Sequence, residues 1–228
     1  MLTNLIAGAD LESTVIRILL SLPIVLLSLS MHEMAHGYIA SKLGDPTAKN
    51  LGRVTLNPIK HLDPIGFICM VLFGIGWANP VPINSRYFKK PRRDMALSAA
   101  AGPISNIILA IIFAVLLKLT YSFLVPAVLT DPSESSFLIL EILISFLLLG
   151  VRLNITLAVF NLIPIPPFDG SRILYVFLPP KYYFGVMKYE RYIAIGIMLL
   201  LFLGVLDPAI SFVSSTIMKL IFLPLGLL

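Results

Sequence analysis

The chain has 228 residues, of which 58% are hydrophobic and 13% are charged, and its mean hydropathy is +0.95. Soluble domains carry roughly 25% charged residues, so this composition excludes a soluble protein and leaves no room for a large soluble domain. The net charge of +5 does not indicate a nucleic-acid partner, because the basic residues fall in short loops beside apolar segments. We therefore expect an all-α polytopic membrane protein.

The first apolar segment predicts a helix from about residue 12 to residue 43, with Pro23 as a candidate kink and a stop signal at residues 44–46. This segment also carries His32, Glu33 and His36, which are candidates for a chemical role and which cleavage would separate from the rest of the chain. We therefore expect a retained membrane anchor and not a cleaved signal peptide. The loop that follows should be cytoplasmic because it is basic, with Lys42, Lys49, Arg53 and Lys60.

Residues 64–84 form a shorter apolar stretch with basic residues on both flanks. A single crossing would place one basic flank outside, so we expect this stretch to enter and leave on the cytoplasmic side as a re-entrant element. Gly74 and Gly76 weaken a helix here. The prolines that follow prevent it from continuing.

The sequence WANPVPIN at residues 77–84 favours an extended conformation. In a strand, Pro80 and Pro82 place their missing N–H groups on the same side, so only the other edge can pair. That edge carries the backbone donors and acceptors of Asn79, Val81 and Ile83.

Two further long apolar segments are predicted at residues 95–124 and 137–162. The loop between them has acidic residues but no Lys or Arg, so it should face outward. A C-terminal apolar part, at about residues 192–228, is interrupted at residues 206–208 and predicts a helical hairpin. We expect one integral-membrane domain over residues 1–228, with about five to six spanning helices and a core at about residues 12–178 that contains all of the candidate site residues described next.

The sequence MHEMAHGYIA at residues 31–40 places three ionisable residues in a membrane helix. Because His32 and His36 are four residues apart, they lie on one helix face and can present two imidazoles to one metal ion. Glu33 beside them completes the pattern of zinc proteases, in which a glutamate acts as general base. The alternative is a polar patch near the helix end, but ionisable residues at membrane depth usually have a function.

Asp169, within FNLIPIPPFDG at residues 160–170, is the candidate for the third protein ligand that a catalytic zinc needs. It follows the third long segment at its cytoplasmic end, so it can meet the histidines. As alternatives, Asp169 can act as a turn or helix-capping residue. His61 and Asp63 are further candidate ligands, although their loop position favours a cap or turn for Asp63.

Two asparagines in the third long segment are costly in an apolar helix unless they make hydrogen bonds. Asn161 can satisfy the backbone broken by the prolines after it, or it can bind a substrate carbonyl. Asn154 lies seven residues earlier on the same face, and a structural role is favoured for it.

Together HEMAH, LNPIKHLDP, GWANPVPIN and FNLIPIPPFDG resemble the motifs of the site-2 protease family of intramembrane zinc metalloproteases, in the short prokaryotic branch without a PDZ domain. The resemblance runs from about residue 31 to residue 174. It implies one zinc ion per chain, the catalytic residue Glu33, and the ligands His32, His36 and Asp169. It also implies that Asn161 positions the scissile peptide and that residues 77–84 belong to a membrane-inserted β element near the active site.

The implied activity is a zinc metalloendopeptidase of the cell membrane that cleaves membrane-spanning helices of single-span proteins near the cytoplasmic side. We expect the substrate helix to unwind and to pair, as a strand, with the edge formed by Asn79, Val81 and Ile83. Two alternatives stay open: a membrane metal-ion transporter that uses the same buried ligands, and an inactive scaffold. The lipid bilayer is the expected surrounding, and no nucleic acid is expected as a partner.

Overall fold

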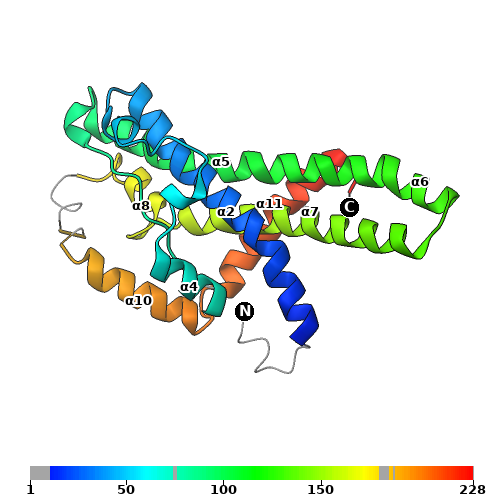
Figure 1. Ribbon diagram of the computed structural model, residues 1–228. Helices are drawn as coiled ribbons and strands as arrows, with labels where there is room; N and C mark the ends of the chain where they lie inside the picture. The colour runs from blue at the N-terminus through cyan, green and yellow to red at the C-terminus, as the bar shows by residue number, and fades with distance from the viewer. Residues whose placement is uncertain (1–10, 74–75, 180–184, 187, 228) are drawn as a thin grey trace.

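The structure is a computed structural model that describes residues 11–73, 76–179, 185–186 and 188–227 (Figure 1). The described chain is helical. Its elements, in chain order, are α2 (Leu11–Lys42), α3 (Thr47–Asn50), the 3₁₀-helix η1 (Pro58–Lys60), α4 (Pro64–Phe73), the 3₁₀-helix η2 (Ser85–Tyr87), α5 (Pro91–Leu119), the π-helical turn η3 (Thr120–Leu124), α6 (Val125–Thr130), α7 (Glu134–Asn161), α8 (Asp169–Leu174), α10 (Glu190–Phe202) and α11 (Asp207–Leu225).

Four helical segments in the described chain are long and apolar enough to cross a membrane: Ile18–Lys42 of α2, the continuous Pro91–Thr130 of α5, η3 and α6, all of α7, and α11. Large apolar side chains cover their outer faces. Phe123, Phe212 and Leu220 are 69%, 73% and 67% exposed, an arrangement that is costly in water and ordinary in lipid. The chain is therefore a membrane protein.

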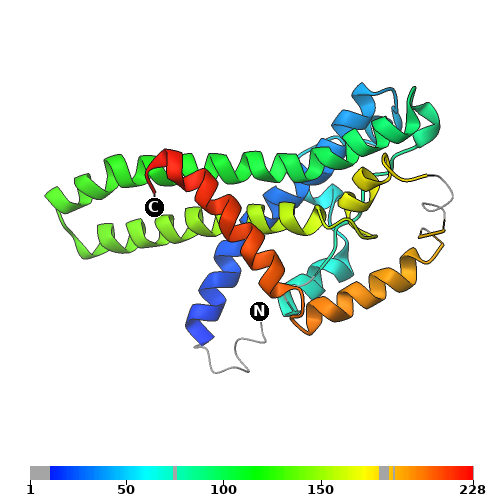
Figure 2. The ribbon, with the colours of Figure 1, turned by 180° about the vertical axis from the view of Figure 1, so that it is seen from behind.

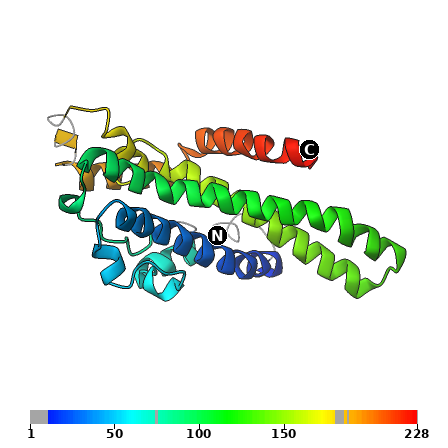
Figure 3. The ribbon, with the colours of Figure 1, turned by 90° about the horizontal axis from the view of Figure 1, so that it is seen from above.

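The long antiparallel pair α5 and α7 forms the centre of the molecule (Figure 1; Figure 2). Helix α2 packs against one side of this pair, whereas α11 packs against the other side (Figure 3). Close approach of α5 to α7 depends on Gly150, because a Cβ atom there would lie 2.5 Å from the ring of Phe113. Small residues at such crossings let membrane helices pack closely where no hydrophobic effect drives them together.

The ends of the helices follow local rules. Helix α2 ends where Gly44 adopts a φ of 112°, a conformation that favours glycine. Asp45 then accepts a hydrogen bond from the backbone N–H of Thr47 and starts α3. Helix α7 begins with a capping box formed by Ser133 and Ser136. It ends at Asn161, just before the prolines that cannot continue a helix.

The predicted helices agree with α2, α5 and α7, although α5 starts at Pro91 and continues through η3 and α6 to Thr130. The predicted re-entrant β element is not confirmed. Residues 64–73 form α4, and the described part of residues 74–84 contains no strand but a single antiparallel bridge between Ala78 and Leu62. Residues 74 and 75 lie outside the described chain.

The predicted count of about five to six spans is also not confirmed, since the described chain has four candidate spans. The predicted C-terminal hairpin corresponds to α10 and α11, which are separated by a turn at residues 203–206. Helix α10 has 13 residues, which gives a length of about 20 Å, less than the thickness of a bilayer core.

Candidate active site

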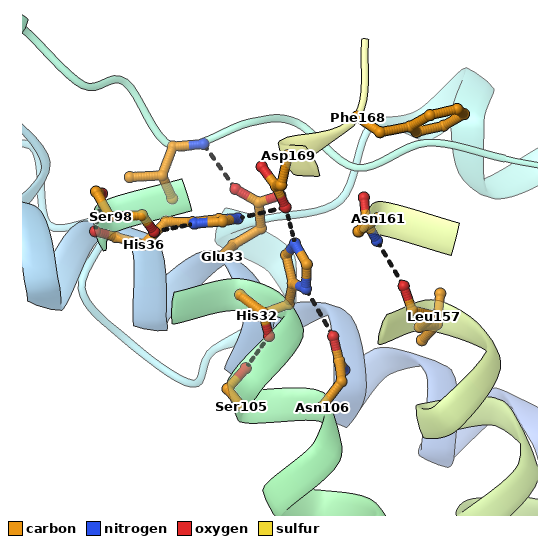
Figure 4. A network of polar contacts seen from close by, with 12 residues as sticks. His32, Glu33, His36, Ser98, Ser105, Asn106, Leu157, Asn161, Phe168 and Asp169 are labelled. Atoms are coloured by element: carbon orange, nitrogen blue, oxygen red, sulfur yellow. Dashed lines mark hydrogen bonds and ion pairs between the residues drawn. The ribbon is translucent and has the colours of Figure 1, made fainter. Parts of the chain in front are cut away.

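Helix α2 presents His32 and His36 on one face, as four-residue spacing in a helix requires. Both imidazoles are buried, with 8% and 9% of the side-chain surface accessible. The two rings meet edge to face with their centroids 4.6 Å apart. Figure 4 shows both rings turned toward the same carboxylate, that of Asp169.

Asp169 stands at the first position of α8, after the proline-rich break that follows α7. One of its oxygens, Oδ2, lies 3.0 Å from Nε2 of His32 and 3.2 Å from Nε2 of His36. The position of α8 is fixed by backbone packing at Gly170, where a Cβ atom would lie 2.3 Å from the carbonyl oxygen of Leu162. Phe168 adds a ring contact with Phe160 at 4.4 Å.

Helix α5 closes the other side of the cluster. Gly102 faces the rings so closely that a Cβ atom would lie 2.5 Å from His36 and 2.6 Å from His32. The same helix supplies the outer partners of both imidazoles. Nδ1 of His36 lies 2.7 Å from the carbonyl oxygen of Ser98, and Nδ1 of His32 lies 2.6 Å from Oδ1 of Asn106 (Figure 4).

These contacts decide what the cluster can bind. A carbonyl oxygen only accepts, so each Nδ1 is the protonated nitrogen and each Nε2 of a neutral imidazole carries a lone pair. Two lone pairs and a carboxylate oxygen therefore converge within 4.8 Å. A cation at their centre resolves the repulsion, and two imidazoles with one carboxylate are a typical ligand set for catalytic zinc.

Glu33 does not join this cluster but lies beside it on α2. Its Oε2 accepts a hydrogen bond of 2.8 Å from the backbone N–H of Val81, and its side chain is only partly buried. The carboxylate therefore combines access to water with a fixed orientation. This is what a general base next to a metal site requires.

Of the predicted substrate-binding residues, Asn161 and Val81 lie near this centre, and Asn79 and Ile83 lie on the same segment as Val81. Asn161 donates to the carbonyl oxygen of Leu157 at 3.0 Å, so one of its two N–H groups is engaged within α7 (Figure 4). Val81 is buried against Glu33, as described above. Asn79 is exposed and Ile83 is half-buried. Their role in binding a substrate stays a prediction.

The edge of residues 79–84 is held by contacts from the loop after α2. The backbone N–H of Asn79 donates to the carbonyl oxygen of His61 at 2.8 Å. Nη2 of Arg53 donates to the carbonyl oxygen of Asn79 at 2.6 Å, and Oδ2 of the buried Asp45 accepts from the backbone N–H of Asn84 at 2.7 Å. The edge is thus largely engaged within the protein.

Three other polar residues considered from the sequence lie outside the cluster. His61 is buried, and its Nε2 bonds to the carbonyl oxygen of Thr55. Asp63 accepts from the backbone N–H of Gly66 and so starts α4, as its loop position predicted. Asn154 is fully buried and is turned toward Asn106.

Sequence reasoning missed Asn106, Gly102 and Ser98. The stretch ALSAAAGPISN at residues 96–106 is rich in small residues, which permit close helix packing and so account for Gly102 in part. An asparagine within this apolar segment was the available signal for Asn106, because a buried amide needs a partner. Ser98 acts through its backbone carbonyl, and no side-chain pattern reveals such a role.

Comparison with known proteins agrees with this geometry. Residues 21–204 match the model of peptidase family M50. YwhC of Bacillus subtilis, which carries the name of a zinc metalloprotease, is 43% identical over 212 residues, which is 88% of this chain and 91% of YwhC. Rip2 of Mycolicibacterium smegmatis, also named as a zinc metalloprotease, is 31% identical over 68% of this chain and 56% of its own length.

A third relative, the archaeal protein MJ0611 of Methanocaldococcus jannaschii, is 27% identical over 63% of this chain and 62% of its own length. No solved structure matches the chain. The family match covers most of the chain, including all of the clustered residues. The chain therefore belongs to peptidase family M50, the site-2 protease family, and is a metalloprotease.

Proposed function

We propose that this protein is a zinc-dependent intramembrane endopeptidase that cleaves membrane-spanning helices of single-span proteins. The observation that carries the proposal is the convergence of His32, His36 and Asp169 within a membrane helix bundle. His32 lies ten residues before the end of α2 at Lys42, which corresponds to about 15 Å along the helix axis. The proposed zinc site would thus lie below the membrane surface.

The roles in catalysis follow from the chemistry of each group. When bound, zinc polarises the scissile carbonyl and acidifies the attacking water. Glu33 takes the proton from that water and returns it to the leaving amine, for which its partly exposed carboxylate is suited. Asn161 has one N–H group beyond its bond to Leu157, and this group is free to orient a substrate carbonyl.

A substrate helix hides its carbonyls in hydrogen bonds, so it has to unwind before hydrolysis. We assign the receiving edge to Asn79, Val81 and Ile83, next to Glu33, by strand addition. Since Arg53 and Glu33 engage part of this edge, a substrate strand has to displace at least one of these contacts. Helix α4 and residues 77–84 together would form the re-entrant element.

The proposed orientation places the active site toward the cytoplasmic side of the cell membrane. Support comes from the distribution of charge: the loops at the end of the bundle that holds the site are basic, whereas the loop between α6 and α7 has only acidic charges. In this orientation α10 would contribute to a further span, which gives about five to six in total.

The test is cleavage of a panel of single-span membrane substrates by purified wild type and by Glu33→Gln, with zinc content measured for both. General acid–base catalysis contributes about 10²- to 10⁴-fold, so the variant should lose at least about 10²-fold in rate. It should keep about one zinc per chain, because Glu33 is not among the clustered ligands. Full activity of Glu33→Gln, or wild-type protein without zinc, would refute the proposal.

A further inference from the structure

Two fully buried amides connect α7 to the metal ligands of α2 through α5: Asn154 and Asn106, both with 0% of their surface accessible. Nδ2 of Asn154 donates to the carbonyl oxygen of Gly150 at 2.9 Å, and its Oδ1 accepts from Nδ2 of Asn106 at 3.1 Å. Nδ2 of Asn106 also donates to the carbonyl oxygen of Ser28 at 3.3 Å. Oδ1 of Asn106 then faces Nδ1 of His32 at 2.6 Å.

The direction of this chain of hydrogen bonds is fixed by its ends. Backbone carbonyls can only accept, so the carbonyl of Gly150 determines which end of the Asn154 amide carries its N–H groups. A reversed Asn106 would bring its Oδ1 against Oδ1 of Asn154 and against the carbonyl oxygen of Ser28. Oxygens without a shared proton repel each other, and a buried acceptor left unpaired is costly.

His32 and His36 are therefore held by different means. The outer partner of His36 is the backbone carbonyl of Ser98, which cannot turn around. The outer partner of His32 is a side-chain amide, and an amide offers either an acceptor or a donor depending on its orientation. His32 keeps its proton on Nδ1 only while Asn106 keeps its orientation.

We propose that Asn154 is a positioning residue that, through Asn106, fixes His32 as the Nδ1–H tautomer and so directs the lone pair of Nε2 into the metal site. The residue acts from the third spanning helix without touching metal or substrate. The competing explanation is that the two amides only join α5 to α7, as interhelical hydrogen bonds do in membranes. That explanation predicts that a change at Asn154 alters the stability of the protein but leaves the tautomer of His32 unchanged.

The experiment compares Asn154→Leu with Asn154→Asp. Leucine removes one of the two acceptors of Asn106 Nδ2 and leaves the carbonyl oxygen of Ser28, at 3.3 Å, as the weaker restraint on its orientation, so zinc affinity should fall by about tenfold or more, as is usual when the outer partner of a ligand is disturbed. A buried aspartic acid is neutral and nearly the shape of asparagine; its O–H can donate to Gly150 while its C=O accepts from Asn106. This variant should bind zinc within about threefold of wild type. Competition with a chromophoric chelator measures both affinities.

Thr120→Val is the matched control, because it removes a buried hydroxyl at the start of η3 that bonds to the carbonyl oxygen of Leu116 in α5, far along the helix from Asn106. It should cost stability without weakening zinc binding. If Asn154→Leu lowers the melting temperature as Thr120→Val does, and leaves zinc affinity unchanged, the amides are only structural and the proposal fails. Equal losses in Asn154→Leu and Asn154→Asp would refute it as well.

A second readout needs no metal. The chain has three histidines, so ¹⁵N-histidine spectra of metal-free protein can be assigned by comparing wild type with His36→Gln and His61→Gln. Wild type should keep a proton on Nδ1 of His32, whatever proton Nε2 shares with Asp169, and Asn154→Leu should lose the Nδ1 proton in part. An unchanged tautomer in Asn154→Leu overturns the inference. The zinc readout rests on the proposed function. If wild-type protein bound no zinc, the proposed function would be refuted, but the spectra of metal-free protein would still decide the inference about Asn154.

Discussion

The cluster of His32, His36 and Asp169 and the segment at residues 79–84 both involve α2, but they are held in different ways. The cluster is buried, and both histidines are fixed by helix α5 through groups that lie inside the bundle. The segment is held mainly through its backbone by the side chains of Glu33, Arg53 and Asp45, and two of its residues, Asn79 and Pro80, are exposed. The cluster is thus built to stay in place, whereas the proposed strand addition would require contacts of the second kind to be exchanged.

The largest effect on zinc binding is expected when one histidine of the cluster is removed. His36→Ala should lower zinc affinity by more than about 100-fold, which exceeds the effect expected for an outer partner, and should abolish cleavage. His61→Ala is the matched control, because His61 is equally buried but bonds only to a loop carbonyl. Zinc content by mass spectrometry of the purified proteins measures the effect. Retention of zinc by His36→Ala would remove this residue from the ligand set.

A smaller effect is expected when the cluster is disturbed without removal of a ligand. Gly102→Ala places a methyl group 2.5 Å from His36, and this contact must displace a ring or α5. Zinc affinity should fall by about tenfold to 100-fold, comparable to the loss of an outer partner. Gly196→Ala in α10 is the control, since no atom lies within 4 Å of its added methyl group. If both variants bind zinc like wild type, α5 does not shape the cluster.

The smallest expected effect concerns the segment. Arg53→Ala removes the hydrogen bonds to the carbonyl oxygens of Asn79 and Pro80. Hydrogen bonds of this kind contribute about 1 kcal/mol, so kcat/KM for a membrane substrate should change by about threefold to tenfold at unchanged zinc content. Lys49→Ala, in the same loop and exposed, should behave as wild type. Loss of zinc in Arg53→Ala would show that the two regions are not independent.

The same contrast explains how much the sequence could predict. The spacing of His32 and His36 on one helix is local, and the proline break before Asp169 marks an irregular segment, so these residues could be selected without a structure. Asn106 and Gly102 act on α2 from α5, more than 60 residues away along the chain, and no local period reveals which face of α5 meets α2. The predicted segment 95–124 was too short at its C-terminal end because η3 lets the helix of α5 continue into α6, to Thr130.

For residues 77–84, local chemistry predicted an extended backbone and therefore a strand. The pattern of prolines could not reveal that side chains from α2 and its loop take up the backbone groups that a partner strand would use. A single bridge, between Ala78 and Leu62, is what remains of the expected pairing in the described part of this region. Tertiary contacts have thus replaced the ladder that the local pattern suggested.

The position of Asp169 at the start of α8 has a consequence for biosynthesis. His32 and His36 emerge from the ribosome 133 or more residues before Asp169, and α5 and α7 come between them. A nascent chain that has inserted only its first helices holds two imidazoles but lacks the carboxylate that completes the ligand set. Translation order therefore delays completion of the three-residue cluster until the chain beyond the third long helix has been made, and a chain truncated before α8 lacks one of the three clustered ligands.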